Sequence, residues 1–273
     1  MEKRACSSTF LPDEFLAKIV AELDEDKVTA IILHGSYVRG EAVPPYSDID
    51  LVRITQENLL SGSYEEKQFL YREGYLLSVS SRPLSVYRQR FIQPERAIFA
   101  IPGVREACIL LDKQGEFHKF QQEAWQWTWE PLQTAADAYA SQLLVEQTEI
   151  ALKLLRALAL HDSLALSEMI TELFVAVTDA VAVQRGVLVR SGNTYFHQVQ
   201  EAVGQQSDWV RYHTCIAGAG THALSLREQG QQMLHLYQET AQLLRKAINP
   251  GHWDVIKQTL STLKQHLSDE EIS

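Results

Sequence analysis

Two adjacent strand patterns near the amino terminus constrain the fold of this chain more than any other feature. The β-branched apolar run Val28–Leu33 leads into a Gly-Ser turn at 35–36, which predicts a buried strand that ends in a tight turn. Over residues 48–54, charged and aliphatic side chains alternate, as is typical of a strand with one buried face. The carboxylates of Asp48 and Asp50 are therefore expected on the same face of that second strand.

The periodicity of the sequence changes near Pro131. Before this residue, short segments with strand-like and helix-like spacing alternate, and after it long helical periodicities take over. We therefore expect an α/β domain with a short mixed sheet over residues 1–130, followed by an all-α helical bundle over residues 131–273. Beyond the two strands above, the first domain is expected to hold helices over Asp13–Glu22 and Tyr64–Arg72 and strands over Tyr75–Ser80 and Ala107–Leu111. The bundle helices are expected over 133–160, 163–185, 194–204, 207–216, 222–247 and 251–267.

The composition narrows the range of partners. The formal net charge is −10, and both halves of the chain carry more acidic than basic residues. Neither half is a basic module that would neutralise the phosphates of a nucleic acid, so DNA and RNA are not the expected partners. No apolar stretch is long enough to span a bilayer, which predicts no membrane association. The oligomeric state stays open, with a homodimer as one alternative.

The cysteines bear on the expected cellular location. Cys6, Cys108 and Cys215 lie about a hundred residues apart, without a CxxC motif or the Cys/His spacing of a zinc site. The amino terminus also lacks the apolar run of a signal peptide. These features predict reduced thiols and a cytoplasmic protein.

The Gly-Ser turn and the two aspartates together indicate phosphoryl-transfer chemistry. A turn formed by Gly35 and Ser36 can direct N–H groups and a hydroxyl at an anion, and a following helix would add its dipole. Asp48 and Asp50 can hold Mg²⁺, which prefers carboxylate oxygens. The pattern therefore predicts a metal-bound triphosphate at residues 35–50.

The segment LHGSYVRGEAVPPYSDIDLVRI, residues 33–54, resembles the signature of the polymerase-β nucleotidyltransferase superfamily. Eleven residues separate Ser36 from Asp48, which lies within the spacing of that signature. Arg39 and Ser47 are similar to residues of small antibiotic-modifying transferases of the superfamily. The second half is similar in pattern to the bundle that follows the catalytic domain in kanamycin- and streptomycin-type adenylyltransferases.

The resemblance implies a metal-dependent transferase with Mg²⁺ or Mn²⁺ on Asp48 and Asp50. It implies that an NTP, expected to be ATP, binds through Gly35, Ser36, Arg39 and Ser47, and that a nucleoside monophosphate passes to a hydroxyl of a small molecule or protein. We expect this enzyme activity for the chain.

One departure from the superfamily pattern concerns a third carboxylate. Members usually carry it on the strand that follows, where this sequence has serines at 78, 80 and 81. The nearest acids are Glu73 and Asp112. This leaves open an alternative function, in which a catalytically weak or inactive relative acts as a nucleotide-binding sensor or binds a protein partner.

Two further charge patterns have both a functional and an ordinary interpretation. The arginines between 82 and 105 either face a triphosphate or form a solvated helix surface. In the bundle, Glu168, Glu172 and Asp179 are spaced to share one helix face. They either form a solvated acidic stripe or supply the missing base and contact a cationic acceptor such as an aminosugar.

Overall fold

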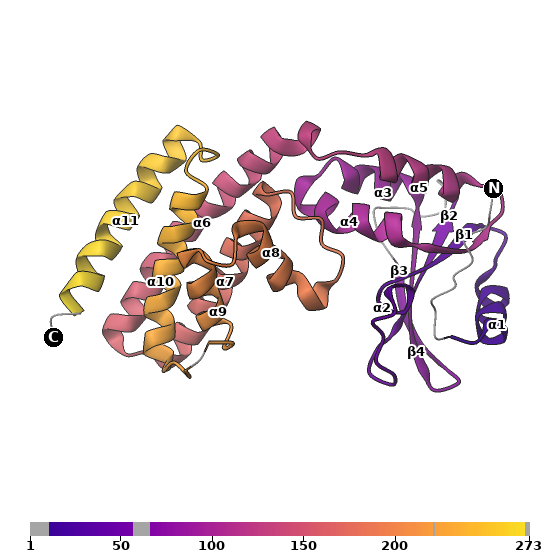
Figure 1. Cartoon of the computed structure of the whole chain (residues 1–273), viewed down its shortest axis with the longest axis horizontal. Helices are drawn as coiled ribbons and strands as arrows, with labels where there is room; N and C mark the ends of the chain where they lie inside the picture. The colour runs from indigo at the N-terminus through magenta and orange to yellow at the C-terminus, as the bar shows by residue number, and fades with distance from the viewer. Residues whose placement is uncertain (1–10, 57–65, 221, 271–273) are drawn as a thin grey trace. The chain divides into compact units, whose positions relative to one another are not determined.

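The computed structural model describes residues 11–56, 66–220 and 222–270. The chain divides into two compact units, whose elements Figure 1 shows in chain order. The first, here the α/β unit, comprises Met1–Thr128 and Leu188–Asn193, and the second, the helical unit, comprises Trp129–Val187 and Thr194–Ser273. The return of residues 188–193 to the α/β unit is a feature that the sequence did not predict.

A mixed sheet forms the centre of the α/β unit. In the described residues its strand order is β3-β4-β2-β1-β5. The pair β2 and β4 is parallel, and the other neighbouring strands are antiparallel. The strands are β1 Val28–His34, β2 Ile49–Thr55, β3 Glu66–Arg72, β4 Tyr75–Pro83 and β5 Cys108–Asp112. The expected short mixed sheet is thus confirmed.

The helix expected over Tyr64–Arg72 is wrong. Tyr64 lies outside the described residues, and Glu66–Arg72 forms β3, which pairs with β4 in a hairpin. The two residues between the strands, Glu73 and Gly74, have φ angles of 50° and 87°. Two consecutive positive φ angles match the twist of a two-residue hairpin turn, so the turn joins two strands and ends no helix.

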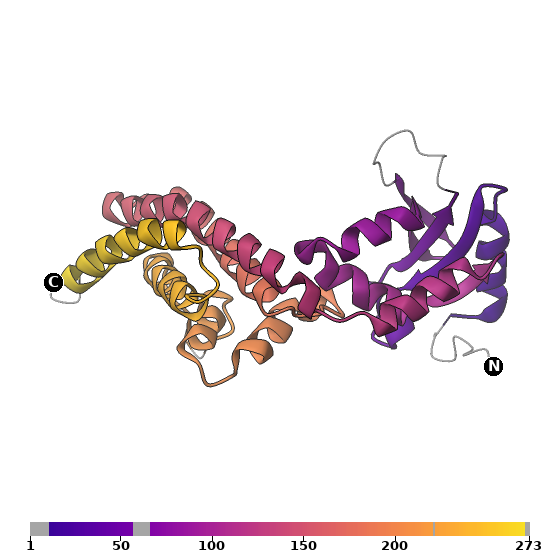
Figure 2. The ribbon, with the colours of Figure 1, turned by 90° about the horizontal axis from the view of Figure 1, so that it is seen from above.

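Helices cover both faces of the sheet, which explains why its central strands are apolar on both sides. Helix α1, Asp13–Leu23, packs its buried residues, such as Phe15 and Ile19, against Leu33 and Leu51. Val52, which points to the opposite face, is buried as well. After β4 come three helices, α3 Leu84–Phe91, α4 Pro94–Glu106 and α5 Glu116–Gln126, which lie across the sheet from α1 (Figure 2).

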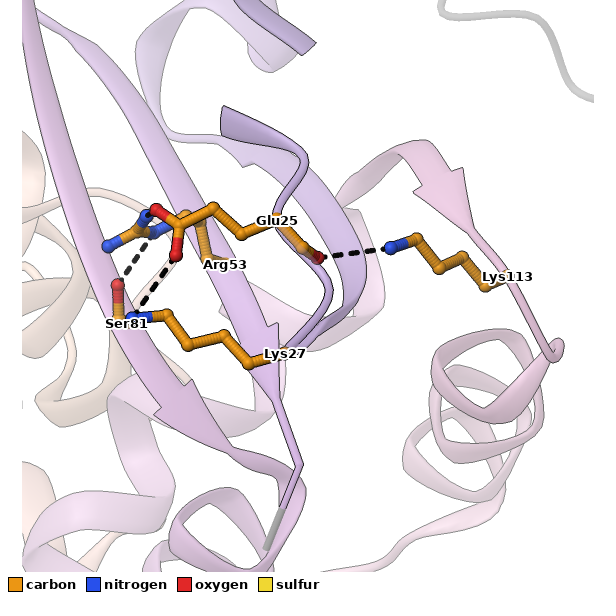
Figure 3. Close-up of polar contacts among 5 residues, drawn as sticks. All are labelled: Glu25, Lys27, Arg53, Ser81 and Lys113. Carbon is orange, nitrogen blue, oxygen red and sulfur yellow. Dashed lines mark hydrogen bonds and ion pairs between the residues drawn. The ribbon is translucent and has the colours of Figure 1, made fainter. Parts of the chain in front are cut away.

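A polar cluster on the α1 side ties β2, β4 and the loop after α1 together (Figure 3). The buried Arg53 donates from Nε to Ser81 Oγ at 2.8 Å and from Nη1 to Glu25 Oε1 at 2.7 Å. Lys27 lies 3.1 Å from the same carboxylate, and Lys113 donates to the Glu25 carbonyl oxygen at 3.1 Å. Arg53 lies on the sheet face opposite to Asp50, because side chains alternate along β2.

The helical unit contains the helices that the sequence predicts, with ends that shift by a few residues. They are α6 Gln133–Leu160, α7 Ser163–Gln184, α8 Tyr195–Val203, α9 Asp208–Ile216, α10 Leu226–Leu243 and α11 Pro250–Glu270. Helix α10 begins four residues later than expected because Ser225 and Glu228 form a capping box there. The predicted all-α character of this half is confirmed.

A buried histidine lies at the centre of the helical unit. His213 Nδ1 lies 2.9 Å from Gln200 Nε2, and His213 Nε2 lies 3.1 Å from Thr178 Oγ1. Thr178 Oγ1 in turn donates to the carbonyl oxygen of Phe174 at 2.7 Å. These hydrogen bonds fit a neutral imidazole that accepts at Nδ1 and donates at Nε2. Burial lowers the pKa of His213 to about 4.

Two features of the structure bear on the expected cellular location, namely the character of the helices and the state of the cysteines. Within the described residues, none of the helices combines the length and the apolar character that a bilayer crossing requires. Cys108 is disulfide-bonded, whereas Cys215 is a free thiol, so the expectation of reduced cysteines is wrong for Cys108. The distance between cysteines along the sequence does not determine their distance in the fold.

Candidate active site

The turn that follows β1 has a backbone geometry that only glycine adopts easily. Gly35 has φ 81° and ψ −156°, and it stands directly before α2, Ser36–Arg39. Helix α2 is a single turn, so its dipole contributes less than the sequence pattern suggested, because the macrodipole sums over aligned peptides. The N–H groups of its first residues have no acceptor within the helix.

The two aspartates meet this turn because β1 and β2 are antiparallel neighbours. Asp50 pairs with His34, the last residue of β1. A Cβ atom on Gly35 would lie 2.5 Å from Asp50 Oδ2. The Gly-Ser turn and the Asp50 carboxylate are therefore in close contact, and a side chain at residue 35 would displace that carboxylate.

The electrostatic environment of Asp50 disfavours its charge. Burial raises the pKa of Asp50 to about 6, and the charge of Asp48 adds to this effect. Lys67, a hydrogen bond from Ser78 and the charge of Arg39 lower the pKa in part. The protein thus offsets the negative charge of the aspartate pair only partly. A divalent cation, which binds carboxylate oxygens, fits this pair.

These residues line a cavity of about 570 Å³. All of its lining residues belong to the α/β unit. Of the residues predicted to bind nucleotide or metal, Gly35, Ser36, Arg39, Asp48 and Asp50 line it.

Ser47 is not brought to this cavity. Its Oγ accepts a hydrogen bond from the Val43 N–H at 2.8 Å and so closes the loop before β2. The geometry gives Ser47 a structural bond in that loop, and its role in nucleotide binding stays a prediction.

Strand β4 shows what stands in place of the third carboxylate. Ser78 is the register partner of Asp50 and donates its hydroxyl to the Asp50 carboxylate. Ser80 lies one step further along the same face, level with Val52, whereas Ser81 lies on the other face with Arg53. Of the three serines on β4, Ser78 is therefore the one that lies level with Asp50.

The two nearest acids in the sequence have other partners. Glu73 pairs with Lys18 at 2.9 Å, and Asp112 accepts from the His118 N–H at 2.9 Å near the start of α5. Neither lines the cavity. Throughout the described part of the chain, no group of three or more His, Cys, Asp or Glu side chains is placed to hold a metal.

The arginines between 82 and 105 divide into two sets. Arg88 pairs with Glu123 at 2.7 Å, and Arg105 donates to the carbonyl oxygens of Ala124 and Trp127. The other three line the cavity and are Arg82, Arg90 and Arg96. The functional interpretation of the run therefore agrees with the geometry for those three only.

Residues 188–193 complete the cavity, although they follow α7 of the helical unit in the sequence. The Val189 N–H donates to the Ile98 carbonyl oxygen at 2.7 Å. Arg190 Nε lies 2.5 Å from Glu106 Oε1 at the end of α4. Both bonds attach the segment to α4, and Val189, Arg190 and Ser191 line the cavity. Sequence reasoning missed this wall, since no local motif marks it.

The acids proposed as a base lie on α7 within the helical unit. Glu168 and Glu172 are exposed, and Asp179 is half-buried. Asp179 accepts a hydrogen bond from the Tyr195 hydroxyl at 2.6 Å, and burial raises the pKa of its carboxyl group. Asp179 thus has a structural partner, and the role of these three acids stays a prediction.

Comparisons with known proteins agree with this geometry. A family model described as a nucleotidyltransferase domain matches residues 15–99. The crystal structure of a nucleotidyltransferase-like protein from Exiguobacterium sibiricum is similar at a TM-score of 0.50 and 11% identity, over 84% of this chain and 74% of that one. At this identity the likeness concerns the fold. No curated protein matches the chain. Residues 15–99, which hold the Gly-Ser turn and both aspartates, therefore belong to the polymerase-β-type nucleotidyltransferase superfamily.

Proposed function

We propose that this chain is a metal-dependent nucleotidyltransferase that moves a nucleoside monophosphate, AMP from ATP, to a hydroxyl group of a small molecule or protein. The observation that carries the proposal is the contact between the Gly35 backbone and the Asp50 carboxylate at the wall of one cavity. This contact brings a turn suited to phosphate oxygens next to carboxylates suited to a divalent cation.

Each residue of the turn and the strand has a distinct task in this proposal. Asp48 and Asp50 would hold Mg²⁺ or Mn²⁺. When bound, this ion neutralises charge on the triphosphate and polarises the α-phosphate. Ser36 offers its hydroxyl and backbone N–H to phosphate oxygens. Arg39, whose Nε is 2.7 Å from Glu41 Oε2, lines the cavity one helical turn further on.

The transfer exchanges one phosphorus–oxygen bond for another. The acceptor hydroxyl oxygen forms a bond to the α-phosphorus, the bond from the α-phosphorus to the bridging oxygen breaks, and pyrophosphate leaves. The hydroxyl proton passes to a base. Glu168, Glu172 and Asp179 remain our candidates for that base. Besides the two aspartates, the described lining of the cavity offers one carboxylate, Glu106, and it pairs with Arg190.

A second function, nucleotide binding without efficient transfer, has its own supporting observation. The hydroxyl of Ser78 donates to Asp50, where an acid would help to bind metal or activate the acceptor. A chain with two carboxylates and a serine can still bind a nucleotide with its metal. Such a protein would act as a nucleotide sensor or bind a protein partner.

Removing both aspartates tests the metal and nucleotide assignment. We expect the double variant Asp48→Asn with Asp50→Asn to lose Mg²⁺-dependent ATP binding in calorimetric titrations, because both carboxylates are ligands. A charge-matched control replaces two exposed acids, Glu14→Gln with Asp26→Asn, and should bind ATP normally. Unchanged ATP affinity in a folded double-aspartate variant would refute the metal assignment.

Release of pyrophosphate from ATP then separates the two functions. A transferase releases pyrophosphate when a suitable acceptor hydroxyl is added, whereas a sensor binds ATP with Mg²⁺ and leaves it intact.

A further inference from the structure

Four arginines line the part of the cavity that lies beyond the Gly-Ser turn. They come from four different places, the end of β4, α3, α4 and the returning segment 188–193. We call them the distal arginines: Arg82, Arg90, Arg96 and Arg190. Arg39 is not among them, because it belongs to α2 beside the turn.

The register of β4 places one of the distal arginines, Arg82, far along the sheet from the aspartates. Ser78 is level with Asp50, and Arg82 lies four residues further along the same face of β4. At about 3.3 Å per residue, the backbone of Arg82 is about 13 Å beyond the level of Asp50. The guanidinium of the buried Arg82 lies 5.3 Å from the centre of the Tyr87 ring, which orients it. Arg82 therefore adds a positive charge to the cavity far along the sheet from the aspartates.

The charge of this lining contrasts with that of the whole chain. Among the described residues that line the cavity, five are arginines and three are carboxylates, although the protein has a net charge of −10. The two aspartates would be neutralised by a bound divalent cation, and Glu106 pairs with Arg190. The lining therefore carries more guanidinium groups than carboxylates, and a planar guanidinium can bind two oxygens of a phosphate or carboxylate at once.

Part of this lining lies outside the nucleotidyltransferase match at residues 15–99. Glu106 and the whole segment 188–193 follow it in the sequence. The segment is held firmly, since Val189 and Ser191 are buried and Val189 donates to the Ile98 carbonyl oxygen. The matched domain therefore supplies the turn, the aspartates and three of the four distal arginines, and residues that follow it in the sequence, Arg190 among them, complete the cavity.

We propose that the distal arginines form a second oxyanion subsite, which holds the acceptor, so that the acceptor carries a phosphate or carboxylate group in addition to its reacting hydroxyl. This inference rests on the proposed function, because it assigns the Gly-Ser turn and the aspartates to the nucleotide. It replaces the cationic acceptor, such as an aminosugar, that Glu168, Glu172 and Asp179 suggested. A cation would meet like charge at this end of the cavity.

A binding experiment on the full chain tests the subsite without knowledge of the acceptor. The protein is first saturated with Mg²⁺ and a non-hydrolysable ATP analogue, which fills the nucleotide site. Inorganic phosphate and glycerol 3-phosphate are then titrated, with glycerol and ethanolamine as neutral and cationic comparisons. We expect the two anions to bind at least about tenfold more tightly than either comparison compound, because hydrogen bonds to charged groups are strong.

A pair of substitutions, one on α3 and one on α4, identifies the residues responsible. Arg90→Gln combined with Arg96→Gln should weaken anion binding by about tenfold or more while nucleotide affinity changes by less than about threefold. The matched control is Arg88→Gln, also on α3, whose side chain is outside the cavity and pairs with Glu123. It should leave both affinities unchanged. Melting temperatures establish that all variants are folded.

The outcomes separate this inference from the proposed function. Loss of nucleotide affinity in the double-arginine variant, as large as its loss of anion affinity, would assign these arginines to the triphosphate and overturn the subsite. Failure of both anions to bind the nucleotide-loaded protein would also overturn it. If the wild-type chain binds no Mg²⁺-nucleotide, the proposed function fails. The anion titration without nucleotide then decides separately whether the arginines bind oxyanions.

Discussion

An alanine at position 35 would place a methyl group into the contact between the Gly-Ser turn and Asp50. The backbone angles of Gly35 lie in a region that is nearly restricted to glycine, which costs an alanine about 1–3 kcal/mol. Its Cβ would also lie 2.5 Å from Asp50 Oδ2. Relief of such an overlap costs about 1–3 kcal/mol more. We expect Gly35→Ala to lower the free energy of unfolding by about 2–6 kcal/mol and to abolish nucleotide binding.

A second glycine at the other end of α2 provides the control. Gly40 has φ 72° and ψ 21°, and a Cβ there would meet no atom within 4 Å. Gly40→Ala therefore carries only the strain of the left-handed conformation, about 1 kcal/mol. Urea denaturation of the full-length variants, followed by circular dichroism, gives both changes in unfolding free energy.

A double-mutant cycle isolates the steric part of the effect. Asp50→Ala removes the oxygen that the new methyl group would overlap, and the Asp50 Cβ, at 3.4 Å, is at ordinary contact distance. In this background Gly35→Ala should cost about 1–3 kcal/mol less than in the wild type. Additivity of the two single changes within about 0.5 kcal/mol would refute the claim that Asp50 excludes a side chain at position 35.

Three more predictions concern serines of the site and the buried histidine. Ser36→Ala should weaken ATP binding by about 1–2 kcal/mol, as one hydrogen bond to a charged group contributes, without lowering the melting temperature; the reverse result would make Ser36 a purely structural residue. Ser78→Asp should raise ATP-dependent pyrophosphate release by about a hundredfold, whereas Ser80→Asp, level with Val52, should not; equal effects would contradict the register argument. His213 has a folded pKa of about 4, below the ordinary value of 6.5, so the unfolded chain takes up the proton first as the pH falls. The free energy of unfolding should therefore drop by up to about 3 kcal/mol between pH 6.5 and pH 4. Urea titrations should show a smaller drop in His213→Gln, and an unchanged pH dependence would contradict the assignment.

The helical half is predictable because its signals are local and repeat over many residues. Each of the longest helices, α6 and α7, spans several turns of apolar periodicity, and their observed bounds lie close to the expected ones. The start of α10 is less predictable, since the capping box of Ser225 and Glu228 decides it.

The failure at β3 has a specific cause. Glu66–Arg72 contains charged and aromatic residues that fit a helix or a strand equally well. The adjacent pair Glu73-Gly74 was the available signal, because both residues take positive φ angles in a hairpin turn. Tertiary pairing with β4 then determines the strand.

The site shows the same division between local and tertiary information. The proximity of Gly35 and Asp50 could be predicted from the sequence, because the two residues stand at either end of the loop that connects two antiparallel strands. Of the distal arginines, Arg82, Arg90 and Arg96 belong to the arginine run that the sequence singled out. Arg190 could not be predicted, since it reaches the cavity only through the packing of the returning segment on α4. No motif in a single sequence marks such contacts.

The return of residues 188–193 to the α/β unit has a consequence for protein synthesis. A ribosome releases β5, the last strand of the sheet, long before Arg190, because α6 and α7 lie between them in the sequence. At a synthesis rate of about 5–20 residues per second, several seconds pass between the synthesis of β5 and that of residues 188–193, which complete the cavity. A polypeptide that stops before residue 188 holds the Gly-Ser turn and both aspartates but lacks this wall. Incomplete nascent chains therefore lack the complete site.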